Sequence, residues 1–291
     1  MGRIRRGWDL TKKAWGVVRS NPGLVKLPIY GGITAFIAFV VFGLPGIALI
    51  AVEQDSASAN AAYVGGGILI AIGAYLSSFA IIYFNVALAA AADSAFQTGT
   101  ADTKAGLALA RSRIKVIAQW ALVAAIVSLI FNLIRERGGL VGQIAAGVGA
   151  AIWSLITFLI APVLAFEGLG PLAAIKRSSS MFKQKWGQQI TGDIAIGAIS
   201  GLAMLLGILI GIGGVFAITA GGAAVIAGGG LLLLGLVILF SAAVVGGAVR
   251  GVFGVALYRY IVSEQIVGPF TVDELEASVK QKKGAKAQPA I

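Results

Sequence analysis

The sequence predicts an all-α polytopic membrane bundle of six transmembrane helices, arranged as three pseudo-repeated hairpins that are each preceded by a cytoplasmic amphipathic helix. Hydrophobic residues make up 58% of the chain and charged residues only 12%, outside the balance of soluble domains. Apolar runs of membrane length, about 20 residues or more, recur along it. Before each hairpin an arginine is followed nine residues later by a tryptophan: Arg6 and Trp15, Arg111 and Trp120, Arg177 and Trp186.

The apolar runs define the expected spans. They cover residues 24–52, 62–92, 114–134, 139–166, 191–218 and 222–249. The last run continues almost without interruption to Val262, which makes about 60 Å of helix from Gly222 at 1.5 Å per residue. Part of this helix is therefore expected to project beyond the bilayer or to bend.

The domain organisation follows from the same pattern. Residues 1–270 are predicted to form a single membrane domain, with repeat units at about 3–93, 102–167 and 170–264. Residues 271–291 are predicted to form a short cytoplasmic helix, which the Thr271 and Glu274 capping pattern begins, and a disordered basic tail.

Each expected amphipathic helix has an apolar and a basic face by its helical spacing. The expected apolar faces are Trp8, Trp15 and Val18; Leu107, Ala110, Ile114 and Ile117; and Leu172, Ile175, Ser179, Phe182 and Trp186. The opposite faces carry Asp9, Lys12, Lys13 and Arg19; Lys104, Ala108, Arg111 and Lys115; and Lys176, Ser180 and Lys183. Such helices lie in the headgroup plane, where they anchor the hairpins, dock a partner or recruit anionic lipid.

The charge distribution predicts the orientation. The net charge is +11, and most lysines and arginines lie in the N-terminal arm, the connections after the second and fourth spans, and the C-terminal tail. By the positive-inside rule both termini are expected in the cytoplasm of a multi-pass cell-membrane protein. Nucleic-acid binding is not expected, because no aromatic and basic platform accompanies the charge.

A lone acidic residue ends each even-numbered span: Asp93, Glu167 and Glu264. A carboxylate in an apolar or interfacial setting needs a partner. The arginines of the recurring pairs, with Arg250 and Arg259 on the last span, are the natural candidates. Two interpretations stay open: the acids form internal ion pairs that orient the helices, or they bind an ion, a lipid headgroup or a substrate.

Polar residues inside the spans are few. Arg250 is a functional candidate by its position in an apolar segment, unless it lies at the interface and extends its charge to the headgroups. Asn85, Asn132 and Gln143 are expected to make interhelical hydrogen bonds. Glycines four residues apart are expected to let helices approach closely: Gly197 and Gly201, Gly207 and Gly211, Gly247 and Gly251.

The chain contains no cysteine and no histidine, which excludes disulfides, thiolate nucleophiles, imidazole bases and the usual zinc ligand sets. No catalytic, cofactor-binding or metal-binding residue is therefore expected. An enzyme would need Asp93, Glu167 and Glu264 to converge on a metal ion.

Several segments resemble a known signature. They are Ala161 to Glu167, Gly170-Pro171, Ala174 to Ser178 and Lys183 to Gly187, with the N-terminal stretch from Trp8 to Pro28. Together they are similar to uncharacterised bacterial six-span integral membrane protein families related to the membrane domain of some glycerophosphoryl diester phosphodiesterases. The resemblance implies a membrane domain that is an accessory to a separate catalytic domain, and no metal-binding catalytic residue carries over.

These observations predict a non-enzymatic integral membrane scaffold or accessory protein without a cofactor. Its basic helices are expected to meet anionic membrane lipid or a protein partner at the cytoplasmic face, and a homo-oligomer stays open. The alternative is a transporter or channel for a lipid or small solute, which a cavity lined by Arg250, Asn85 or Asn132 would favour.

Overall fold

The computed structural model describes residues 3–52, 59–185, 192–222 and 224–271, and every regular element within them is a helix. In chain order the elements are α1 (Arg3–Ser20), α2 (Gly23–Ala38), the π-helix η1 (Phe39–Gly43), α3 (Leu44–Val52), α4 (Ala59–Thr98), α5 (Thr103–Ser112), α6 (Ile114–Arg137), α7 (Gly139–Ile156), α8 (Ile160–Pro162), the π-helix η2 (Val163–Glu167), α9 (Pro171–Lys185), α10 (Gly192–Thr219) and α11 (Ala224–Ser263).

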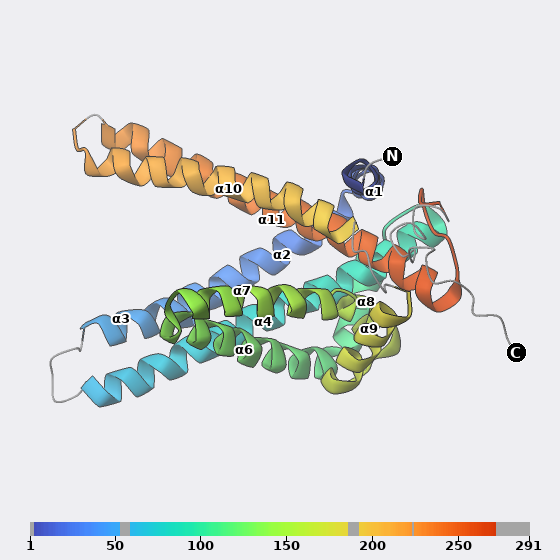
Figure 1. Cartoon of the computed structure of the whole chain (residues 1–291), viewed down its shortest axis with the longest axis horizontal. Helices are drawn as coiled ribbons and strands as arrows, with labels where there is room; N and C mark the ends of the chain where they lie inside the picture. The colour runs from blue at the N-terminus through green and yellow to red at the C-terminus, as the bar shows by residue number, and fades with distance from the viewer. Residues whose placement is uncertain (1–2, 53–58, 186–191, 223, 272–291) are drawn as a thin grey trace, which may run out of the picture.

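Three hairpins point in the same direction (Figure 1). Their arms are α2–α3 with α4, α6 with α7, and α10 with α11, and their tips lie at the left of the view, which we call the hairpin end. The helices α5, α8 and α9 and the last turns of α11 gather at the opposite, basal end. Also at this end, α1 is seen nearly end-on and so lies crosswise to the hairpins.

Among the described residues, six helical segments are long and apolar enough to cross a membrane. They are Gly23–Val52, Ala59–Thr98, Ile114–Arg137, Gly139–Ile156, Ser200–Thr219 and Ala224–Ser263. Large apolar side chains cover their outer surfaces; Phe216, for example, is 72% exposed. Soluble proteins rarely expose so large a contiguous apolar surface to water, whereas such a surface is expected where lipid surrounds the helices. The structure thus confirms an all-helical chain with six helices of membrane-spanning character.

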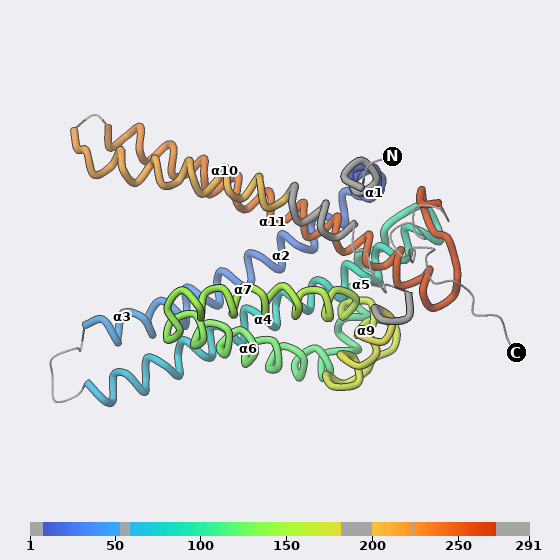
Figure 2. Tube along the Cα trace, viewed as in Figure 1, coloured from blue at the N-terminus to red at the C-terminus, as the bar shows by residue number. Residues whose placement is uncertain are grey.

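The buried core lies toward the basal end. It joins the segment Val86–Ala92 of α4, the segment Val252–Leu257 of α11, the π-helix η2 and two leucines of α2, Leu24 and Leu27. Toward the hairpin end the third hairpin leaves the other two, as the trace in Figure 2 shows. The three hairpins are therefore held together mainly at their basal ends.

The first and fourth predicted spans are interrupted near prolines. Pro45 cannot donate a hydrogen bond to the carbonyl one turn earlier, and the wide π turn η1 comes just before it. The prediction of one continuous fourth span over 139–166 is wrong. Its helix α7 ends at Ile156, because Pro162 cannot donate to the carbonyl of Phe158, and Thr157 and Leu159 leave helical geometry with ψ of 3° and 10°.

The second span is longer than predicted, and the sixth has about the predicted length. Each of α4 and α11 is a single helix of 40 residues. At 1.5 Å per residue this is about 60 Å, against a hydrocarbon core of about 30 Å. Both helices therefore extend well past the bilayer core, as expected for the last span but not for the second.

Close glycine packing occurs at one pair with the predicted spacing of four and also at a spacing of seven. Gly207 and Gly214 of α10 face Gly235 and Gly228 of α11, where an added Cβ at Gly214 would lie 2.6 Å from the backbone nitrogen of Leu232. The predicted pair Gly207 and Gly211 lies against Gly235, whose added Cβ would be 2.6 Å from the carbonyl oxygen of Gly207 and 2.8 Å from the nitrogen of Gly211. In the other two predicted pairs, an added Cβ at Gly201 or Gly247 would meet nothing within 4 Å. A spacing of seven keeps glycines on the seam of antiparallel helices that cross at a shallow angle.

The buried faces of α1, α5 and α9 agree with the prediction only in part: Val18, Ala110 and Ile117 are buried as predicted, and other predicted residues are not. The buried faces consist of Leu10, Ala14 and Val18 in α1; Gly106 and Ala110 in α5; and Ala174, Ser178 and Met181 in α9. Trp8 and Trp15 are largely exposed, and so are Ile114 and Leu172. The buried faces combine small residues, which allow close backbone contact, with the large side chains of Leu10, Val18 and Met181. Trp8 and Trp15 occupy the outer surface, where a bilayer interface suits tryptophan.

Candidate functional site

Asp93 and Arg259 form an ion pair between the first and third hairpins. Asp93 lies near the basal end of α4 and is 7% exposed. Arg259 on α11 donates from Nε to Oδ1 of Asp93 at 2.7 Å and from Nη2 to Oδ2, which gives two parallel hydrogen bonds. Gln97, one turn along α4, donates to the same Oδ2 at 2.8 Å. The carboxylate thus has three donors from two helices.

Glu167 forms a second ion pair at the end of η2. Arg177 on α9 donates from Nε to both carboxylate oxygens at 3.0 Å. Tyr258 on α11 donates its hydroxyl to Oε1, also at 3.0 Å. The Arg177 side chain is 39% exposed, so solvent reaches this pair more than it reaches Asp93 and Arg259. This pair joins η2 to α9, and the Tyr258 hydrogen bond joins η2 to α11 of the third hairpin.

Aromatic contacts join the two ion pairs. The guanidinium of Arg259 lies 5.3 Å from the ring centroid of Phe166, which in turn lies 5.4 Å from the ring of Tyr258. We call the set Asp93, Arg259, Phe166, Tyr258, Glu167 and Arg177 the basal network. It links α4, η2, α9 and α11 at one end of the bundle, and its contacts stabilise the packing of these elements.

Sequence reasoning named the charged members of this network but missed its neutral ones. Their positions in the sequence are a signal that could have identified them. Gln97 lies one helical turn after Asp93, and Tyr258 is the neighbour of Arg259. Arg113 was missed as well; its Nε donates to the carbonyl of Ala165 at 3.3 Å and so holds η2 against the start of α6. Asn21 accepts a hydrogen bond from the backbone nitrogen of Ala101 at 2.8 Å and joins the α1–α2 corner to the α4–α5 connection.

Gly168 ends η2 and directs the chain away from Glu167. Its φ is +63°, and an added Cβ would lie 2.5 Å from Arg113 Nη1. We expect Gly168→Ala to lower the free energy of unfolding by about 1–2 kcal/mol, because a left-handed conformation is costly for any residue with a Cβ. Gly170→Ala is the matched control, since its Cβ would meet nothing closer than 3.9 Å. Equal stability of the two variants in a detergent unfolding titration would contradict the claim that the left-handed conformation at position 168 requires glycine.

The other predicted residues do not form one cluster. The side chain of Arg6 and all of Trp186 lie outside the described residues. Trp15 is 39% exposed and Trp120 only 4%, so the two described tryptophans of the recurring pairs have different surroundings. Arg111 is exposed on α5, and Glu264 is exposed just after α11 with a left-handed φ of 55°.

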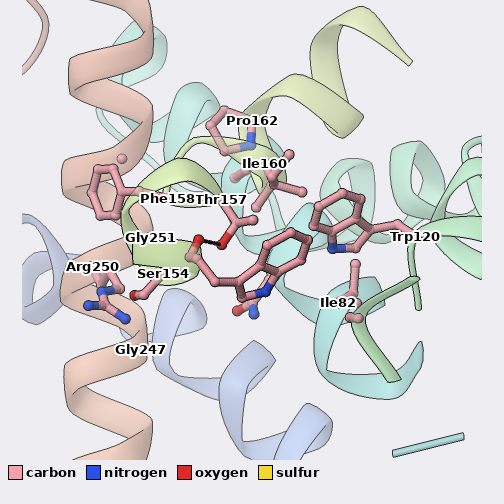
Figure 3. Close-up of a pocket in the computed structure, with 16 residues that line it drawn as sticks. Ile82, Trp120, Ser154, Thr157, Phe158, Ile160, Pro162, Gly247, Arg250 and Gly251 are labelled. Carbon is pink, nitrogen blue, oxygen red and sulfur yellow. Dashed lines mark hydrogen bonds between the residues drawn. The ribbon is translucent and has the colours of Figure 1, made fainter. Parts of the chain in front are cut away.

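A cavity of about 360 Å³ lies between α4, α6, the α7–α8 segment and α11. It is within the range of about 300–1,000 Å³ that is typical of small-molecule sites. Its polar lining consists of Asn85, Trp120, Trp153, Ser154, Thr157 and Arg250. Figure 3 shows Arg250 on α11 at one side and Trp120 on α6 at the other. Asn132 does not line it, whereas Asn85 and Arg250 do.

The indole rings of Trp120 and Trp153 lie 5.8 Å apart and nearly parallel, at 2° between their planes. The hydroxyl of Thr157 donates to the carbonyl of Trp153 at 2.7 Å. The side chains of Asn85 and Ser154 and the indole nitrogen of Trp120 have no hydrogen bond to another described residue. A buried indole nitrogen normally has a partner, so these donors are available to a ligand or to water.

Within the described parts of the chain, no group of three Asp, Glu, His or Cys residues is close enough to hold a metal ion. Asp93, Glu167 and Glu264 accordingly form no such group. Two of these acids are instead held by arginines, as described above.

Fold and site together define an α-helical chain of multi-pass membrane character, with an ion-paired basal end and a cavity beside it whose lining is partly polar. The chain belongs to a family of unknown function, DUF6159, whose model matches residues 64–268. No curated protein and no solved structure matches it. The resemblance to the membrane domain of glycerophosphoryl diester phosphodiesterases therefore receives no support from these comparisons.

Proposed function

We propose that this chain is a non-catalytic scaffold or accessory protein of the cell membrane, which presents a basic surface to anionic lipid at its basal end. One observation carries the proposal: basic side chains at this end are exposed, while Asp93 and Glu167 are neutralised internally. The exposed basic residues are Lys12, Arg19, Lys26, Lys104, Arg111, Lys115 and Lys176. Each one near an anionic leaflet contributes about 1 kcal/mol.

The basal end is proposed to face the cytoplasm, since cytoplasmic loops of membrane proteins carry the excess of lysine and arginine. The crosswise position of α1 supports its placement in the headgroup plane, where exposed Trp8 and Trp15 suit the interface (Figure 1). Lys12 lies over the Trp8 ring at 5.5 Å, so apolar and basic groups alternate on this outer face. A protein partner is the other occupant that this surface suits.

The three hairpins are further proposed to be copies of one unit, a basic amphipathic helix followed by two spans. Their common direction in Figure 1 and the order α1, α5 and α9 before each hairpin support this. The unlike surroundings of Trp15 and Trp120 show that, if copies, they have diverged.

The lipid proposal is tested by reconstituting the full chain into nanodiscs of phosphatidylglycerol and phosphatidylcholine and measuring the lipid that co-purifies. We expect wild type to enrich phosphatidylglycerol, and the triple variant Lys104→Glu, Arg111→Glu, Lys115→Glu to bring the ratio close to that supplied. Raising the salt concentration should weaken the enrichment, because exposed charges are screened.

The matched control is Arg135→Glu with Arg137→Glu, which changes exposed arginines at the hairpin end. These substitutions should leave the enrichment unchanged if the basal surface is responsible. An unaltered lipid ratio in the triple basal variant would refute the proposal. If the triple basal variant keeps the lipid enrichment but loses a protein that co-purifies with wild type from native membranes, the basal surface binds a protein partner instead.

A transporter or channel for a lipid or small solute is the second candidate, and the cavity beside Arg250 and Asn85 favours it. Transport requires access from both sides, so reconstituted vesicles should show flux that a cavity-filling substitution abolishes. If the vesicles bind anionic lipid but show no flux of it, the transporter proposal is wrong and the scaffold proposal is favoured.

A further inference from the structure

The cavity beside Arg250 has a lining that is rich in hydrogen-bond donors and carries one positive charge. Arg250 supplies the charge, and the lining residues within the described part of the chain include no Asp or Glu. Asn85, Ser154 and the buried Trp120 supply donors without another described partner. The Trp120 nitrogen lies on the side of its ring toward the other lining residues (Figure 3). Such a set matches an anion whose oxygens accept several hydrogen bonds.

The position of the cavity along the helices indicates where such an anion would come from. Asn85 lies 26 residues after Ala59, and Arg250 lies 26 residues after Ala224. For an upright helix this is about 39 Å from the hairpin end, which is beyond a hydrocarbon core of about 30 Å and within the headgroup layer. The stacked tryptophans fit the same depth.

The remaining lining is apolar, which points to an amphiphile. Ile82, Ile160 and Pro162 line the cavity, and Gly247 leaves open space where an added Cβ would meet nothing within 4 Å. An acyl chain or glycerol backbone suits this part, while phosphate oxygens suit the donors.

We propose that this cavity binds the phosphate-bearing headgroup of an anionic phospholipid, with Arg250 at one side of the headgroup and Trp120 at the other. The inference rests on the proposed placement of the basal end in the inner headgroup layer and goes beyond it: one lipid is held in a defined site, apart from the diffuse basic surface. Arg250 is then a ligand-binding residue rather than one that only extends its charge to the interface.

The test uses the purified full chain in neutral detergent, with thermal stability and native mass spectrometry as readouts. Phosphatidylglycerol should stabilise wild type and remain bound as one molecule, whereas phosphatidylcholine should not. Equal stabilisation by the two lipids would overturn the proposal without any variant. Glycerol phosphate and inorganic phosphate form a second arm; binding as strong as that of the lipid would keep the phosphate chemistry but assign the site to a soluble ester or ion.

Two variants probe the site in different ways. Arg250→Gln removes the charge, and Gly247→Leu fills the open space; each should raise the half-saturating phosphatidylglycerol concentration about tenfold. The controls are Arg135→Gln, an exposed arginine at the hairpin end that belongs to neither the cavity nor the basic surface, and Gly230→Leu, an exposed glycine on the same helix with nothing within 4 Å of its added Cβ. Unchanged half-saturation in both cavity variants, with wild-type helical content, would refute the site.

The outcomes separate this inference from the proposed function. Loss of the single bound lipid in Arg250→Gln, with bulk phosphatidylglycerol enrichment intact, supports the site alone. Loss of bulk enrichment in the basal triple variant, with the cavity variants unaffected, supports the basic surface and overturns the cavity site.

Discussion

Replacing Gly214 by leucine is expected to destabilise the third hairpin by about 3 kcal/mol, at the upper end of the range for overpacked sites. An added Cβ there would lie 2.6 Å from the backbone nitrogen of Leu232 and 2.7 Å from the carbonyl oxygen of Gly228. Backbone atoms cannot turn aside as a side chain can, so α10 and α11 must separate. In lipid, close packing rather than the hydrophobic effect holds two helices together. Separating α10 from α11 therefore removes the contacts that stabilise the hairpin.

The neighbouring Gly213 provides a matched control on the same turn. Its added Cβ would meet nothing within 4 Å, and the residue is exposed. Gly213→Leu should therefore leave the unfolding midpoint in a detergent titration close to that of wild type. A similar loss of stability in both variants would show that leucine destabilises α10 itself rather than its packing against α11.

Asp93→Asn is the second substitution with a large expected effect. It leaves Arg259 without its anionic partner in a mostly buried position, and removing one member of such a pair costs about 3–5 kcal/mol. Because the Arg259 side chain is 26% exposed, we expect the lower end of that range. Unfolding of purified protein measures the loss, and Glu136→Gln, an exposed acid at the hairpin end, is the control.

A double-mutant cycle separates the pair from the surrounding packing. The double variant Asp93→Asn, Arg259→Gln should lose less stability than the sum of the single variants, because neither side chain then leaves an unpaired charge. Glu167→Gln should cost less than Asp93→Asn, since Arg177 is more exposed than Arg259. Additive losses for Asp93 and Arg259 would contradict a direct interaction.

The sequence is sufficient to predict the all-helical class and six helices of membrane-spanning character, because apolar runs of this length have few other structures available. It does not predict where helices break. Pro162 lies inside an apolar run, and hydropathy cannot register a missing backbone donor. It also misplaces part of the buried faces of α1 and α9, since small residues such as Ala14 and Ala174 are buried while Trp8, Trp15 and Leu172 face outward.

The sequence predicts which charged residues belong to the basal network, but it does not predict which acid pairs with which arginine. Acids at helix ends need partners, which is enough to nominate Asp93 and Glu167 together with a set of arginines. Which arginine pairs with which acid depends on how the hairpins rotate against one another, and Asp93 and Arg259 are 166 residues apart in the chain. The cavity depends on four separate elements and could not be assembled from local spacing.

Both proposals require that the three hairpins enter the membrane from the same side, with the basal end in the cytoplasm. The chain has no cysteine, so single cysteines can be introduced at exposed sites and labelled with a membrane-impermeant maleimide. Glu136→Cys and Ala220→Cys at the hairpin end should react in intact cells, and Thr98→Cys and Ser263→Cys at the basal end only after permeabilisation. Reaction of Thr98→Cys or Ser263→Cys in intact cells would contradict the account.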